Sequence, residues 1–120
     1  MKIKVKAGYM FQKVGTDHHY SVNKNTEVET YMNREIGNKT HFYFRLGGKK
    51  YKVDSGGLIP MYHKGQQTTF IAEKGKKLKG QIQGVIDNWN NKYGPAYLVG
   101  VDDGKNSQYQ VPERSIIKCK

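Results

Sequence analysis

Apolar and polar residues alternate along several short segments of this chain, and alternation with a period of two is the pattern of half-buried β-strands. In residues 2–7, Ile3, Val5 and Ala7 share one face while three lysines occupy the other. Fourteen glycines are scattered along the chain, and apolar residues rarely recur at helical spacing. The pattern therefore predicts a mostly β fold, or an α+β fold with at most one short helix.

One segment does have helical spacing. Over residues 27–36, Val28, Tyr31 and Met32 would lie on one face of a helix. Asn25 or Thr26 stands just before this segment, and both are residue types that cap the start of a helix. We therefore expect the single helix to cover residues 27–36.

The best-defined element is a hairpin over residues 41–54. Phe42 and Phe44 alternate with polar residues, and Gly47-Gly48 supplies the positive φ angles that a tight two-residue turn needs. This turn sets a register in which Phe44 faces Tyr51. The opposite face of the hairpin then carries one aromatic and three basic side chains: Tyr43, Arg45, Lys50 and Lys52.

The second half of the chain repeats this pattern. Strands are predicted at residues 81–86, 97–101 and 109–111 and at a final aliphatic pair, with a polar loop over residues 87–95. In both halves a Tyr-x-Val strand is followed, four residues later, by two aliphatic residues. This echo predicts two strand-rich units, residues 1–64 and 65–120, which either form tandem domains or pack as a single one.

Charge suggests a class of partner. The 120 residues include 21 basic and 10 acidic side chains, a formal net charge of +11, and both halves carry nearly the same excess. The positive charge therefore belongs to the folded body and attracts nucleic acid or an acidic protein surface. No apolar run is long enough to span a membrane, and the single Cys119 excludes an internal disulfide, so we expect a cytoplasmic protein.

Five stretches of the second half share the pattern of a known family, at residues 80–86, 97–101, 102–104, 109–111 and 112–117. Together, residues 75–118 resemble an SH3-like small barrel of the KOW/Tudor type. Such barrels occur in transcription factors, ribosomal proteins and small phage proteins that bind nucleic acid. The resemblance implies an SH3-like barrel in the C-terminal half and a binding role without catalysis.

A second resemblance covers residues 9–62. Residues 20–22, 42–44, 48–53 and 58–59 look like the DNA-contacting module beside HNH nuclease domains in phage homing endonucleases. That family usually has a histidine soon after its Tyr-x-Val strand, whereas Asp54 and three small residues stand there in this chain. The resemblance implies contact with DNA, and the missing histidine argues against nuclease activity.

Three groups of residues are candidates for contact with nucleic acid. The first is the outward face of the hairpin named above. The second is a lysine-rich stretch that can follow a row of phosphates. The third is the polar loop, whose exposed aromatic rings can stack on unpaired bases. The second and third groups are Lys74, Lys76, Lys77 and Lys79, preceded by Lys64, and then Trp89, Lys92 and Tyr93.

The sequence predicts a non-enzymatic nucleic-acid-binding protein of low sequence specificity, without a cofactor, of the kind phages encode as accessory factors. It does not distinguish DNA from RNA. A protein that docks on a host enzyme as an inhibitor is the chief alternative, and a protein that sequesters small nucleotides is another. A metal-dependent nuclease would use Asp17, His18, His19 or His41, because histidine and aspartate ligate metals and transfer protons.

Overall fold

The computed structural model describes residues 1–90, 94–102, 104–105 and 107–120, and for residues 87–90 it describes the backbone alone. Within these ranges the chain forms β-strands and short 3₁₀ turns, so the predicted mostly β fold is confirmed. The strands of the first half are β1 (Lys2–Val5), β2 (Phe11–Lys13), β3 (His19–Tyr20), β4 (Thr26–Ile36), β5 (Lys39–Leu46), β6 (Lys49–Asp54) and β7 (Leu58–Ile59). Those of the second half are β8 (Gln67–Ile71), β9 (Lys77–Asn90), β10 (Gly94–Val101), β11 (Ser107–Pro112) and β12 (Ile116–Cys119). The 3₁₀ turns are η1 (Ser55–Gly57), η2 (Glu73–Gly75) and η3 (Glu113–Ser115).

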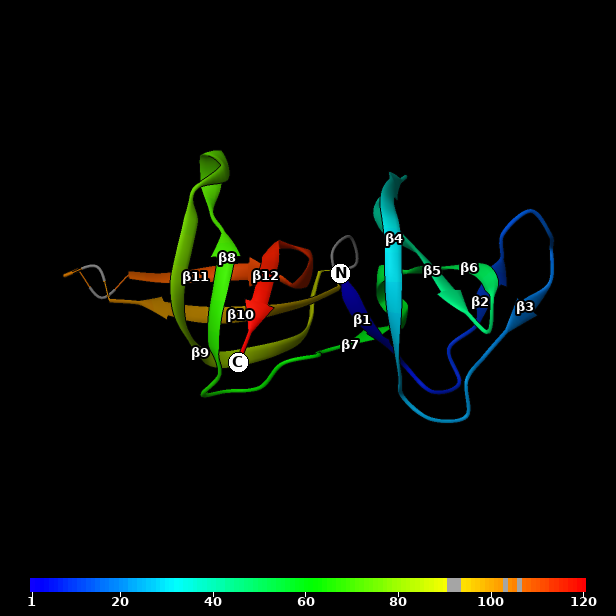
Figure 1. The fold of residues 1–120 in the computed structure, drawn as a ribbon, viewed down its shortest axis with the longest axis horizontal. Coiled ribbons are helices and arrows are strands. Elements are labelled where there is room, and N and C mark those ends of the chain that lie inside the picture. The colour runs from blue at the N-terminus through cyan, green and yellow to red at the C-terminus, as the bar shows by residue number, and fades with distance from the viewer. Residues whose placement is uncertain (91–93, 103, 106) are drawn as a thin grey trace.

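The strands form two sheets, and the chain passes from one to the other between β7 and β8 (Figure 1). The first unit, residues 1–59, has the strand order β3-β2-β6-β5-β4-β1-β7, and the second unit, residues 67–120, has the order β11-β10-β9-β8-β12. Apart from the short strands β2 and β3, both orders are the same: the last strand pairs with the first, and the second, third and fourth follow. Each unit also ends in a strand, a 3₁₀ turn and a short strand. The molecule measures 51 × 28 × 24 Å.

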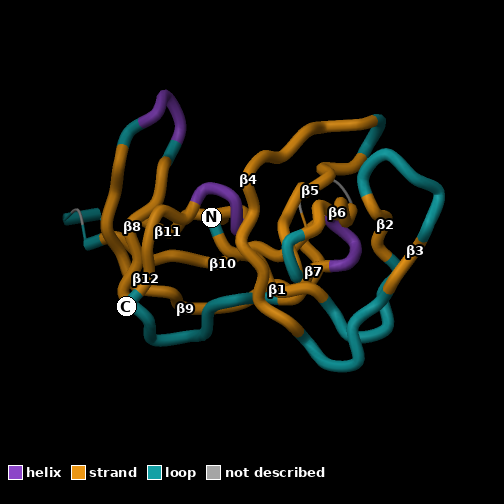
Figure 2. The backbone as a smooth tube through the Cα atoms, turned by 45° about the vertical axis from the view of Figure 1, so that its right-hand side comes forward, coloured by secondary structure: helices purple, strands orange, loops and turns teal. Residues whose placement is uncertain are grey.

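Each sheet curls around its own apolar cluster, and the backbone tube shows the two curled sheets side by side (Figure 2). Alternation explains the local choice of residues, because Ile3 and Val5 of β1 are buried as the sequence predicts. The first cluster contains Ile3, Val5, Phe11, Val28, Phe42, Phe44, Val53 and Leu58. The second contains Phe70, Ile82, Tyr97, Val99, Val101, Val111 and Ile116.

The predicted helix over residues 27–36 is wrong, because this segment is strand β4. Its β-branched residues lose little conformational freedom in a strand, where such side chains pack well. The strand also pairs on both sides, with Val28 opposite Ile3 of β1 and Thr30 opposite Phe44 of β5. These pairings between distant segments bury Val28 and outweigh a weak local preference for helix.

The predicted hairpin is confirmed. Phe44 pairs with Tyr51 across β5 and β6, and the turn glycines Gly47 and Gly48 have φ angles of 60° and 80°. The predicted polar loop over residues 87–95 is wrong at both ends, because β9 runs to Asn90 and β10 begins at Gly94. Paired strands satisfy the backbone hydrogen-bonding groups of these polar residues, so a polar composition did not require a long loop.

The segment between the two units is bound to the second unit by a buried polar pair. The Tyr97 hydroxyl donates to Oε1 of Glu113 over 2.5 Å, and the backbone N–H of Met61 lies 2.8 Å from the same oxygen and 2.9 Å from the hydroxyl. Glu113 is 2% exposed. Burial raises the pKa of its carboxyl to about 7, although the hydrogen bonds from Tyr97 and Met61 favour the charged form.

Candidate nucleic-acid interface

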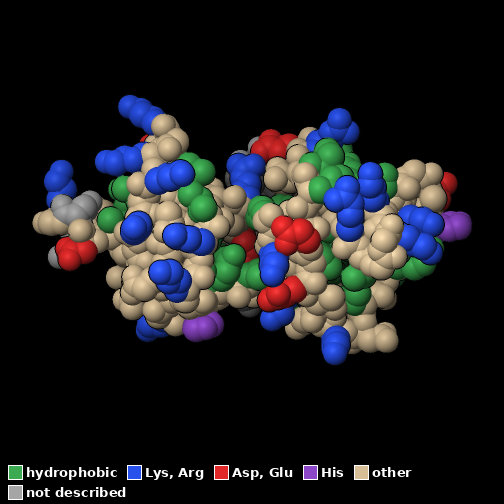
Figure 3. All heavy atoms as spheres, viewed as in Figure 1, with side chains coloured by type: hydrophobic (Ala, Val, Ile, Leu, Met, Phe, Trp, Pro, Cys, Tyr) green, Lys and Arg blue, Asp and Glu red, His purple; other side chains and the backbone are tan. Residues whose placement is uncertain are grey.

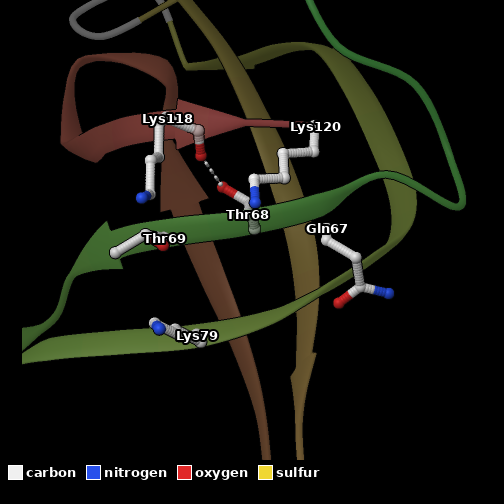
Figure 4. A pocket seen from close by; sticks show the side chains of 6 residues that line it. All are labelled: Gln67, Thr68, Thr69, Lys79, Lys118 and Lys120. Carbon is white, nitrogen blue, oxygen red and sulfur yellow. Dashed lines mark hydrogen bonds between the residues drawn. The ribbon is translucent and has the colours of Figure 1, made fainter.

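The outward face of the second sheet carries lysines from two strands that the fold brings together. Thr69 of β8 pairs with Lys118 of β12 on one side and with Lys79 of β9 on the other, so the three side chains form one row across the sheet. The row belongs to a groove, the lysine groove, lined by Gln67, Thr68, Thr69, Lys79, Lys118 and Lys120. In Figure 4 the three lysine side chains lie on the same side of the sheet.

Hydrogen bonds hold the C-terminal strand against β8 and so position its lysines. The Thr68 hydroxyl donates to the carbonyl oxygen of Lys118 over 3.1 Å (Figure 4), and the backbone N–H of Lys120 donates to the carbonyl oxygen of Gln67 over 2.9 Å. Thr68 itself is buried. The backbone that carries Lys118 and Lys120 is therefore held against β8.

The lysine groove continues along β9 into a wider depression of about 440 Å³, the glutamine groove. The two share Gln67 and Lys79. Its glycines have no room for a side chain, because a Cβ added to Gly80 would lie 2.5 Å from the carbonyl oxygen of Gly100. Most of the other described lining residues are polar, and Asp102 is acidic; the described lining is Gln67, Lys79, Gly80, Gln81, Gln83, Gly100, Val101, Asp102 and Ser107.

Amides give the glutamine groove both hydrogen-bond donors and acceptors. Two hydrogen bonds position the lining glutamines: Gln108, outside the lining, donates from Nε2 to Gln83 Oε1 over 2.8 Å, and Gln81 Nε2 donates to the carbonyl oxygen of Gly65 over 3.2 Å. Lysine ammonium groups bind phosphate oxygens as point charges, whereas amides bond sugar hydroxyls and base edges. Together the two grooves offer side chains that can bind a polyanion with polar substituents.

The predicted hairpin residues lie on the outward face of the first unit. The Tyr43 ring is covered by neighbouring side chains and is not open for stacking on bases. The guanidinium of Arg45 lies 4.8 Å from the centre of the Tyr31 ring, and the ammonium of Lys50 lies 5.5 Å from it. The Tyr43 ring packs beside Tyr31 at 6.2 Å, and Tyr43 is only 8% exposed. We call Tyr31, Tyr43, Arg45 and Lys50 the tyrosine–cation face.

On this face the cationic groups are accessible to a ligand, whereas the Tyr43 ring is not. The two cations lie over the Tyr31 ring and are themselves exposed, so they can contact phosphates. A covered ring such as Tyr43 cannot stack on a base. Lys52 pairs with Tyr43 across the strands and is half-buried. The face is therefore suited to backbone contact rather than to base stacking.

The predicted lysine-rich stretch does not form a single row. Lys74 lies in η2 at the tip of the β8–β9 hairpin, with a φ of 62°, and Lys76 follows it. Both line a separate groove of about 840 Å³, whose apolar residues include Leu78 and Tyr109. Lys77 and Lys79 are alternate residues of β9 and share the outward face, but only Lys79 lines the lysine groove.

The remaining predicted contacts are Trp89, Lys92 and Tyr93, and their side chains lie outside the described part of the structure. The backbone of Trp89 belongs to β9, but its side chain is outside the described part of the structure, and so are Lys92 and Tyr93 altogether. Their predicted role in base stacking stays a prediction.

The candidate catalytic residues are spread apart. Asp17, His18 and His19 are exposed around the β2–β3 turn, whereas His41 lies on β5 opposite Asp54. Burial, as the largest effect, lowers the pKa of His41. Among the described residues, no three His, Cys, Asp or Glu side chains come close enough to hold a metal ion together.

Comparison with known proteins adds no relative. No family model, curated protein or solved structure matches the chain. In the described ranges, no helix has the length and apolar character needed to cross a membrane. The interface is therefore judged on its own geometry.

Sequence reasoning missed several residues of these surfaces. Lys118 and Lys120 alternate at the end of the chain, and that spacing could have placed both on the outward face of a final strand. Tyr31 was assigned to a helix, so its place beside Tyr43 was not expected. The glutamines line the glutamine groove because of the pairing between strands, and this pairing cannot be read from the sequence.

Proposed function

We propose that this protein is a non-enzymatic nucleic-acid-binding protein of low sequence specificity. The lysine groove is the observation that carries the proposal. Lys79 on β9 and Lys118 on β12 are more than a quarter of the chain apart in sequence, yet they line one groove together with Lys120, which follows β12. Among the described residues, the lining of this groove has no acidic side chain. A groove of this kind concentrates positive potential and binds a chain of phosphates.

Low specificity is part of the proposal because of the kind of contacts available. Lysines and glutamines on a sheet contact phosphates and sugars, which position a nucleic acid without selecting its sequence. Sequence-specific proteins commonly insert a helix into the major groove, and the described residues contain no helix longer than a 3₁₀ turn. We therefore expect similar affinity for nucleic acids of different sequence.

The fold supports the same reading in both halves. Apart from β2 and β3, both units have the same order of five strands, with a 3₁₀ turn between the fourth and fifth strands. We propose that the second unit is an SH3-like barrel and that the first is a second copy of the same architecture, enlarged by β2 and β3. Fold alone does not fix function, so the proposal rests on the groove.

A titration tests the proposal. Labelled duplexes and single strands of several sequences are titrated with the protein at about 50 mM salt and at higher concentrations, where electrostatic affinity falls steeply. We expect binding at low salt that changes little with sequence. Absence of binding to every polymer would overturn the proposal. If the polymers fail to bind and mononucleotides alone raise the thermal stability, the protein sequesters small nucleotides. If the polymers fail to bind and a protein partner copurifies after nuclease treatment, the protein is an inhibitor that docks on another protein.

A further inference from the structure

Two basic surfaces lie on the same side of the molecule. In Figure 3, Lys and Arg side chains gather over β8 and β9 in one half and over β5 and β6 in the other. The lysine groove is built on β8, β9 and β12, and the cations of the tyrosine–cation face come from β5 and β6. A straight ligand laid along the long axis can therefore approach both without passing around the molecule.

Acidic side chains separate the two surfaces. Figure 3 shows them near the middle of this view, between the two halves. The exposed acidic residues of β4, which we call the acidic strip, are Glu27, Glu29 and Glu35. Glu29 lies 3.1 Å from the N-terminal ammonium, and Glu35 lies 3.4 Å from Arg114 of the second unit. The strip adjoins the tyrosine–cation face, because Glu29 pairs with Arg45 across β4 and β5.

We propose that a single nucleic-acid duplex bridges the lysine groove and the tyrosine–cation face, so that the two units act as a bivalent clamp on one ligand. This inference rests on the proposed function. A duplex suits the surfaces better than a single strand, because Tyr43 is covered and the described residues that line the lysine groove include no aromatic ring. Single strands gain much of their affinity by stacking bases on exposed rings, whereas a duplex offers its phosphates.

The dimensions set the ligand length. A duplex rises about 3.4 Å per base pair. Its persistence length of about 500 Å makes it straight on the scale of this protein. The molecule is 51 Å long, so about 15 base pairs reach from end to end. A much shorter duplex occupies one surface at a time, and a longer one occupies both.

Bridging has a characteristic energetic signature. When one surface has bound, the second binding event is intramolecular, and the combined affinity exceeds either affinity alone by a factor of roughly 10² or more. Loss of one surface therefore costs much more on a long duplex than on a short one. A protein that uses only one surface shows the same cost at both lengths.

The experiment compares duplexes of about 8 and about 24 base pairs, stabilised as hairpins, in DNA and in RNA form. Three variants are titrated against each length. Lys79→Gln/Lys118→Gln weakens the lysine groove, Arg45→Gln/Lys50→Gln weakens the tyrosine–cation face, and Lys6→Gln/Lys24→Gln removes the same charge from exposed positions outside both. Lys6 and Lys24 lie outside the lysine groove and the tyrosine–cation face. All six substituted residues are exposed.

We expect Arg45→Gln/Lys50→Gln to weaken binding of the long duplex about tenfold or more and of the short duplex less than threefold, in keeping with the loss of bivalency. The Lys6→Gln/Lys24→Gln control should lose equally little at both lengths. Glu27→Gln should tighten the long duplex more than the short one, because it removes a negative charge from beneath the bridging segment.

The outcomes separate the inference from the function on which it rests. Equal losses at both lengths would overturn bridging and leave nucleic-acid binding intact. A long single strand that shows the same dependence on both surfaces, with no preference for duplex, would overturn the assignment to duplexes. If no polymer binds at low salt, the proposed function itself fails. The DNA and RNA arms show which duplex the clamp takes.

Discussion

The two units share one backbone plan but place different residues at equivalent points. Phe42 pairs with Val53 in the first unit as Tyr97 pairs with Val111 in the second, and five positions lead from each valine to the final strand. At the first position of the 3₁₀ turn, Ser55 corresponds to Glu113. The first unit therefore has an aromatic core residue without a polar group where the second has a buried Tyr97–Glu113 pair.

The hydrogen bonds around the 3₁₀ turn differ between the two units. Before η1, Asp54 accepts from the backbone N–H of Gly56 over 2.9 Å and from the Tyr9 hydroxyl over 2.6 Å. Burial and this hydrogen bond raise the pKa of Tyr9 to about 12. Pro112 stands before η3, where the buried carboxylate of Glu113 instead receives bonds from Tyr97 and from the segment that joins the units.

The two units also differ in the polar contacts of their turns and in their outward faces. In the first unit, Asp54 and Tyr9 form hydrogen bonds around η1, and cations lie over the Tyr31 ring of the outward face. In the second unit, the buried pair ties down the connecting segment, and the outward face keeps an open, polar groove. The two units therefore share their topology and differ in the side chains at equivalent positions.

The largest expected effects come from truncating the equivalent core residues. Phe42→Ala should lower the free energy of unfolding by about 3–5 kcal/mol because it leaves a cavity. Tyr97→Ala should cost more, since it also removes a hydrogen-bond partner of buried Glu113 and of the Met61 N–H. Urea unfolding measures both, and a smaller loss for Tyr97→Ala would contradict the importance of the polar pair.

The buried carboxyl of Glu113 makes the stability of the second unit depend on pH near neutrality. The folded-state pKa of Glu113 is about 7, above its ordinary 4.5. Its contribution is therefore fully present below pH 4.5 and is lost as pH rises through 7, by at most about 3 kcal/mol. Glu113→Gln should flatten the fall in stability between pH 5 and 8, whereas Glu73→Gln, at an exposed site in η2, should leave it unchanged. Equal curves for Glu113→Gln and the parent protein would contradict the raised pKa.

A glycine distinguishes the two 3₁₀ turns. A Cβ added to Gly57 would lie 2.4 Å from the Tyr9 ring and 2.7 Å from the Val53 side chain, whereas the equivalent position in the second unit is already a residue with a Cβ, Ser115. Gly57→Ala should therefore cost about 1–3 kcal/mol through overpacking. Ser115→Ala should change stability by less than about 0.5 kcal/mol. Thermal unfolding of the two variants makes the comparison, and similar losses would break it.

The smallest expected effect concerns the cations of the first unit. Arg45→Gln removes an exposed cation–π contact with Tyr31 and should lower stability by about 0.5–1 kcal/mol. Arg34→Gln, at an exposed position of β4, serves as the control for the lost charge. If both variants lose the same amount in urea unfolding, the contact with Tyr31 contributes nothing measurable.

The sequence predicts much of the fold where residues alternate and turns carry glycine. The hairpin register and the inward faces of β1 and β10 follow from such local signals. The segment at 27–36 has weak local preferences, and only its pairing with β1 and β5 makes it a strand. The candidate site is harder to predict, because Lys79 and Lys118 become neighbours through β8, whose pairing with both is not visible in the order of residues.

Salt dependence tests the role of the lysine groove most directly. The parent protein, Lys79→Gln/Lys118→Gln and Lys6→Gln/Lys24→Gln are titrated with one duplex over a series of salt concentrations; the two variants have the same net charge. If both groove lysines bind phosphates, the slope of log affinity against log salt should fall in magnitude by about 2 in the groove variant, roughly 0.9 for each contact, and hardly at all in the control. Equal slopes in the two variants would show that total charge, and not the groove, attracts the nucleic acid.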